Sequence, residues 1–127
     1  MTNTFLLNDF YNIESVNKTD DSTIHTTIKL NPNHSIFKGH FEQMPVVPGV
    51  CQTQIIKEVL QNEIGINLMM TKGDNIKFTG MIIPTQHPSF TMELKYKKGE
   101  ENNYLVEASL FFENTTFTKF KGTFIQN

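Results

Sequence analysis

Apolar and polar residues alternate along three segments of the chain, which is the pattern of strands that bury one face of a sheet. These segments are residues 22–30, 90–97 and 104–112. Turn-forming residues follow at 98–103 and 113–114, and a further strand is predicted over 115–125. The second half of the chain therefore predicts a meander of antiparallel strands.

The apolar spacing changes to that of a helix in the middle of the chain. Cys51, Ile55 and Val59 recur every four residues, which places them on one helix face. Pro48 suits a first helical turn because its missing N–H is not needed there. Gly65 is a residue type that ends helices. A helix is therefore predicted over residues 49–64.

The remaining segments carry weaker signals. Residues 31–46 contain prolines, a glycine and several Asn and Ser residues, and they predict a loop. Residues 5–13 are apolar enough to pack, but their periodicity is ambiguous. Short strands are predicted at residues 67–70 and 75–78 on either side of a turn at 72–74, and at 81–83 before Pro84. The order predicts one α+β domain, residues 1–127, with an antiparallel sheet wrapped around one helix.

Composition narrows the classes of function. All eleven cationic side chains are Lys and the net charge is −2, which disfavours nucleic-acid binding. Eleven Phe residues fit a dry core or an apolar tunnel. One cysteine excludes an internal disulfide, and neither a signal peptide nor a membrane span is predicted. We expect a cytoplasmic protein.

His40 is the first candidate for chemistry. It follows Gly39 in the predicted loop, and a glycine allows the backbone to approach another group closely. As a histidine, His40 titrates near neutral pH, which suits a general base. Taken alone, a loop histidine is more often an ordinary hydrogen-bonded residue.

The predicted helix offers two further features. The first backbone N–H groups of a helix lack internal partners, so those of Gly49 and Val50 could polarise a carbonyl oxygen. The simpler interpretation is a helix that merely begins at Pro48. Gln54 and Glu58 are four residues apart and border the apolar stripe. For Glu58, a charge on the surface near Asn62 is the commoner outcome.

These residues together resemble a known signature. The chain resembles the β-hydroxyacyl-(acyl-carrier-protein) dehydratases in the spacing of one set of residues: His34, Phe37, Gly39-His40-Phe41, Pro45 and Pro48-Gly49-Val50. The segment from Asn75 to Pro84, with Phe78 in its strand, is similar to a second segment of that family.

The resemblance implies the hotdog fold, a curled antiparallel sheet around a long helix. It implies a homodimer with acyl tunnels at the interface, a thioester of acyl-carrier protein or coenzyme A as substrate, and no cofactor. His40 would remove the α-proton, and the Gly49 N–H would hold the thioester carbonyl. The substrate-binding residues expected are Phe37, Gly39, Phe41, Pro48, Gly49, Val50, Cys51 and Phe78, with Met44 as a further tunnel residue.

The chain departs from the family pattern at the second acid/base position. The resemblance places a Glu or Asp there, on the helix of the partner subunit and fourteen residues after the histidine in sequence, and this chain has Gln54. A Gln amide can hold a hydroxyl group but cannot act as an acid. Three explanations follow: Glu58, one turn or about 5.4 Å further, supplies the acid; His40 makes both proton transfers; or the site binds acyl chains without dehydrating them.

Other chemistries compete with dehydration. A hydrolase using Cys51 and His40 is conceivable, because a helix start can stabilise a thiolate. A metal site formed by His34, His40 and Glu42 is a weaker candidate. Two alternatives to the dehydratase remain: an acyl-binding subunit whose partner supplies the missing carboxylate, and an acyl thioesterase.

Overall fold

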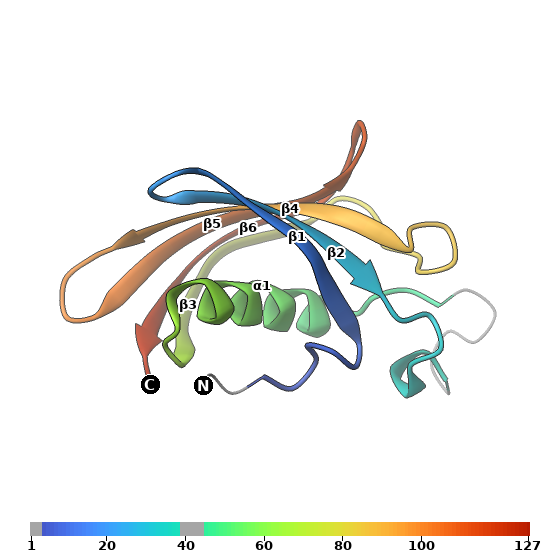
Figure 1. Ribbon diagram of the computed structural model, residues 1–127, viewed down its shortest axis with the longest axis horizontal. Coiled ribbons are helices and arrows are strands. Elements are labelled where there is room, and N and C mark those ends of the chain that lie inside the picture. The colour runs from blue at the N-terminus through green and yellow to red at the C-terminus, as the bar shows by residue number, and fades with distance from the viewer. Residues whose placement is uncertain (1–3, 39–44) are drawn as a thin grey trace.

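The computed structural model describes residues 4–38 and 45–127. In this part of the chain one helix lies against a curled sheet of six antiparallel strands (Figure 1). The strands are ordered β1-β2-β4-β5-β6-β3 across the sheet. Their bounds are Tyr11–Asp20 for β1, Thr23–Leu30 for β2, Leu68–Phe78 for β3, Ser89–Lys98 for β4, Asn103–Phe112 for β5 and Thr115–Gln126 for β6.

The helix, α1, spans Gly49–Ile64, and a short 3-10 helix, η1, covers Ser35–Phe37. Gly65 caps α1 in the left-handed conformation, with φ of 72°, and its N–H donates to the carbonyl of Gln61 at 2.8 Å. This is the usual role of a glycine after a helix. The predicted helix and its end are confirmed.

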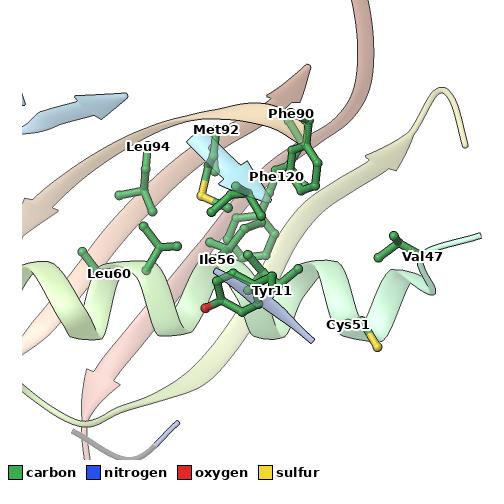
Figure 2. Close-up of a cluster of buried hydrophobic side chains, with 14 of the residues drawn as sticks. Tyr11, Val47, Cys51, Ile56, Leu60, Phe90, Met92, Leu94 and Phe120 are labelled. Atoms are coloured by element: carbon green, nitrogen blue, oxygen red, sulfur yellow. The ribbon is translucent and has the colours of Figure 1, made fainter. Parts of the chain in front are cut away.

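The core lies between α1 and the concave face of the sheet. The alternating side chains of β4, Phe90, Met92 and Leu94, are buried against Ile56 and Leu60 of the helix (Figure 2). Alternate residues of β5 and β6 are buried in the same way. The expected α+β hotdog architecture is confirmed, since a curled antiparallel sheet encloses one helix.

Two predictions about strands were wrong. Residues 72–74 form no turn, because β3 is a single strand paired with β6 along its length. Register shifts after Met70 and Gly73 absorb the residues that suggested a turn. Residues 81–83 belong to no strand, although Ile82 and Ile83 are buried.

Strand β1 went unpredicted because its sequence lacks a buried face. Most of its residues are exposed, and it lies at one edge of the sheet, paired with β2. The segment before it, residues 4–10, runs alongside α1 on the side away from the sheet (Figure 1). Within the described ranges, no helix is both long and apolar enough to cross a membrane.

Candidate functional site

The start of α1 presents two backbone donors. Pro48 is extended, with φ of −61° and ψ of 149°, and its carbonyl accepts the N–H groups of Cys51 and Gln52 at 3.0 and 3.1 Å. The N–H groups of Gly49 and Val50 donate to no group within residues 4–38 and 45–127. Both point along the positive end of the helix dipole, so they can bind the oxygen of a ligand.

Of these two residues, Gly49 lines a largely apolar hollow of about 370 Å³. It is lined by Val46, Val47, Pro48, Gly49, Gln52, Phe78, Gly80 and Met81. The Phe78 ring lies directly against Gly49, because a Cβ built there would be 2.8 Å from Cζ of the ring. A glycine at position 49 is therefore needed for this contact between helix and strand.

Gln52 holds the chain that leads into the helix. Its Nε2 donates to the carbonyl of Val47 at 3.1 Å, and its Oε1 accepts a short hydrogen bond from the hydroxyl of Thr118 in β6. Gln52 is buried, and the Val47 N–H donates to the carbonyl of Ile82 at 2.9 Å. Gln52 was not predicted, since a helical glutamine carries no signal of its own until its partners are known.

Glu58 is fully buried, so the predicted surface charge was wrong. Its carboxylate accepts the backbone N–H groups of Phe5 at 2.8 Å, Leu6 at 3.1 Å and Leu7 at 2.9 Å. It also accepts the hydroxyl of Tyr11 at 3.0 Å. The cause is tertiary, because residues 4–10 cover this face of the helix and bring their own donors.

Gln54 also contacts Glu58. The Gln54 Nε2 donates to Oε2 of Glu58 at 2.7 Å, which is the spacing expected one helical turn apart. Within the described ranges, every group hydrogen-bonded to the carboxylate is therefore a donor, and an ionised carboxylate is acceptor-only. These contacts favour an anchoring role for Glu58 over the acid role expected from the sequence.

Two neighbouring groups have perturbed ionisation. Burial, then the charge of Glu58 and the hydrogen bond to it, raise the pKa of Tyr11 above its ordinary value, so Tyr11 remains a neutral donor. Burial also raises the pKa of the Cys51 thiol. Because a thiolate is the reactive form, this shift argues against the Cys51 hydrolase.

His34, in the first part of the predicted loop 31–46, is held by two hydrogen bonds. The His34 Nδ1 accepts the N–H of Ile36 at 3.0 Å, which leaves Nε2 to donate to Asp9 at 3.0 Å. Both ring nitrogens of His34 are therefore engaged within the protein. Phe37 is buried and packs on Phe10, with ring centroids 5.2 Å apart, and does not line the hollow.

The expected site residues do not all lie together. Pro48, Gly49 and Phe78 come together at the hollow, and Gln54 contacts Glu58. The Val50 side chain is 76% exposed, whereas Cys51 is buried in the core at the same end of the helix (Figure 2). The other candidates lie outside the described residues and stay predictions: Gly39, His40, Phe41, Glu42 and Met44.

Solved structures share this architecture over most of their length. An uncharacterized protein from Erwinia carotovora subsp. atroseptica superposes with a TM-score of 0.66 and 22% identity, covering 90% of this chain and 92% of its own. The dehydratase heterocomplex ApeI:P from Xenorhabdus doucetiae gives a TM-score of 0.66 and 19% identity, covering 90% and 96%. The PaaI protein from the phenylacetic acid degradation operon of E. coli gives 0.63 and 11%, covering 88% and 82%. At these identities the likeness shows the fold, and the chain is a hotdog-fold protein.

The sequence itself shows the family. The family model for ApeI-like proteins, described as ApeI dehydratase, matches residues 15–119. The chain therefore belongs to the ApeI-like dehydratase family. A search of curated protein sequences finds no significant match.

Proposed function

We propose that this protein is a hydro-lyase that converts β-hydroxyacyl thioesters into trans-enoyl thioesters and water, in fatty-acid or polyene-type lipid synthesis. The observation that carries the proposal is the start of α1, where the N–H groups of Gly49 and Val50 have no acceptor in the described part of the chain and Gly49 lines an apolar hollow. Donors aimed at a carbonyl oxygen stabilise the negative charge that develops there when the α-proton leaves. The family assignment supports the same class of reaction.

In this proposal the thioester oxygen lies against the two N–H groups and the acyl chain against Phe78. His40 takes the α-proton, the C–H electrons form the new double bond, and the β-hydroxyl leaves. His40 then returns that proton to the leaving oxygen, which gives water. Gln54 orients the hydroxyl, and Glu58 holds Gln54.

The thioester would be carried by acyl-carrier protein or coenzyme A, in the cytoplasm, and the protein would act as a dimer. A second candidate is an acyl-binding subunit that receives its acid from a partner chain. Two observations favour it: Gln54 stands at the acid position, and donors surround Glu58. The structural neighbour ApeI:P is itself a dehydratase heterocomplex.

The test is turnover of β-hydroxyacyl thioesters by the purified protein, followed by the absorbance of the enoyl product. His40→Ala should lower kcat/KM by about 10²–10⁴-fold. His25→Ala is the matched control, because His25 pairs with Glu93 at 2.7 Å on β2 and β4, away from the helix start. Retained activity in His40→Ala would contradict the mechanism.

Two other results would redirect the assignment. Binding of the thioester without turnover, with turnover restored by a partner chain, would establish the acyl-binding subunit. Release of free thiol without the enoyl product would establish a thioesterase, which the same fold can also support.

A further inference from the structure

The side-chain amide of Gln54 has one permitted orientation. Its neighbour at 2.7 Å is an oxygen of Glu58, and an ionised carboxylate can only accept hydrogen bonds. The amide nitrogen must therefore face Glu58, since the amide oxygen would be repelled. The carbonyl oxygen, Oε1, then lies at the other end of the amide group.

Glu58 is itself unable to turn away. It is fully buried, and three consecutive backbone N–H groups, those of Phe5, Leu6 and Leu7, bind both of its oxygens. The Tyr11 hydroxyl adds a further bond at 3.0 Å. Because these donors come from a separate segment of the chain, rotation of the carboxylate would break several bonds at once.

The opposite end of the Gln54 amide carries its acceptor, Oε1. No group in the described part of the chain donates to Oε1, and the Gln54 side chain is only partly buried. One turn earlier, Val50 is exposed beside the helix-start N–H groups. The helix therefore offers ligands two backbone donors at its start and a side-chain acceptor one turn further.

We infer that Glu58 is a positioning residue, which keeps the acceptor Oε1 of Gln54 directed to the ligand, and that Gln54 thereby selects a β-hydroxyl group over the matching β-ketone. A hydroxyl donates to Oε1, whereas a ketone has no hydrogen to donate and leaves Oε1 unpaired. The inference rests on the proposed function, because it places the β-carbon of a thioester next to Gln54.

The experiment compares two ligands that resist turnover, the amide analogues of 3-hydroxyoctanoyl and 3-oxooctanoyl pantetheine. Titration calorimetry should show that the wild-type protein binds the hydroxyl ligand about tenfold more tightly. Gln54→Met should bring the ratio of the two dissociation constants close to one. Glu58→Gln should lower the ratio as well, because a glutamine can donate or accept and so permits the Gln54 amide to turn over.

Two variants serve as controls. Glu63→Gln removes a carboxylate from the same helix, where Glu63 lies 3.9 Å from Lys18, and should keep the tenfold ratio. Tyr11→Phe removes one donor to Glu58 but leaves its contact with Gln54, and should also keep the ratio.

A second measurement applies even if Glu58→Gln fails to fold. In the wild-type protein the Gln54 side-chain amide, assigned by its loss in Gln54→Met, should show one proton shifted downfield and protected from exchange in ¹⁵N-resolved NMR spectra. Two rapidly exchanging amide protons would overturn the positioning role. Equal binding of the two ligands by wild-type protein would overturn the selectivity alone, and no binding of either would overturn the proposed function with it.

Discussion

One stripe along α1 has an apolar residue at one end and a charged residue at the other. Their burial is the opposite of what these residue types suggest. Val50, Gln54 and Glu58 follow one another at four-residue intervals on the same helix face. The apolar Val50 is 76% exposed, whereas the charged Glu58 is not exposed at all. Burial on this helix is therefore decided by what covers each turn, and side-chain polarity does not decide it.

The covering segment explains the contrast. Residues 4–10 pass over the Glu58 turn and supply backbone donors to its carboxylate. No described residue accepts from the N–H groups at the start of the helix. One end of the stripe is thus held by the protein itself, and the other end carries the donors that the proposed function assigns to the ligand.

The largest expected effect comes from removing the Glu58 carboxylate. Glu58→Ala leaves three backbone N–H groups and the Tyr11 hydroxyl without their acceptor. We expect the free energy of unfolding to fall by about 3–5 kcal/mol, measured by urea denaturation. Glu63→Ala should cost less than about 1 kcal/mol, because its partner Lys18 is half exposed.

That pair of variants also tests the comparison itself. If Glu58→Ala were no more destabilising than Glu63→Ala, the carboxylate would not be anchoring residues 4–10. The contrast between the two ends of the stripe would then be lost.

Substitutions at the start of α1 should change ligand binding more than stability. Gly49→Ala places a methyl group where the Phe78 ring lies, at 2.8 Å from Cζ, so the half-exposed ring must move into the hollow. We expect about a tenfold fall in kcat/KM, or in thioester affinity if the protein only binds. The free energy of unfolding should change by less than about 1 kcal/mol, because alanine suits a helix better than glycine.

The double variant Gly49→Ala/Phe78→Leu sharpens this prediction. A smaller side chain at 78 should relieve the contact and restore part of the loss, with Phe78→Leu alone as the reference. A wild-type rate in Gly49→Ala would mean that the hollow beside Phe78 does not hold the acyl chain.

The smallest effect is expected for Tyr11→Phe, which removes one of several donors to Glu58. The free energy of unfolding should fall by about 1 kcal/mol near neutral pH. Because the pKa of Tyr11 is raised in the folded protein, the unfolded chain loses this proton first as the pH rises past the ordinary value of 10.0. The stability of the wild-type protein should therefore decline above pH 10.0.

The stability of the Tyr11→Phe variant should decline less above pH 10.0, because it has no tyrosine at this position to lose a proton. Urea denaturation of both proteins at about pH 8 and about pH 11 measures it, with the ordinary tyrosine value between them. If the difference between the two proteins stayed constant across this range, Tyr11 would not be held neutral by burial and Glu58.

The elements that were predicted correctly have one buried face. Strands β2, β4, β5 and β6 alternate along the sheet, and α1 carries an apolar stripe, so periodicity found them. Strand β1 is an exposed edge with no buried face, and β3 contains bulges that look like a turn in the sequence. Their position depends on pairing with β2 and β6, which local pattern does not contain.

The residues of the candidate site show the same difference between local and long-range signals. Pro48, Gly49 and Phe78 were identified from a local motif and meet in the structure. Glu58 was misjudged and Gln52 was missed, because Tyr11 and Thr118, which bind them, are 47 and 66 residues away in sequence. The proposed base, His40, remains a prediction from the motif.

The sequence alone determined the kind of fold, the bounds of the helix and the motif that opens it, because periodicity, proline and glycine act over a few neighbouring residues. Only the tertiary structure decided that Glu58 is buried, that Gln54 is oriented by it and that Phe78 lies on Gly49. Each of these depends on which distant segment lies against the helix, and on whether that segment brings hydrogen-bond donors or an apolar ring.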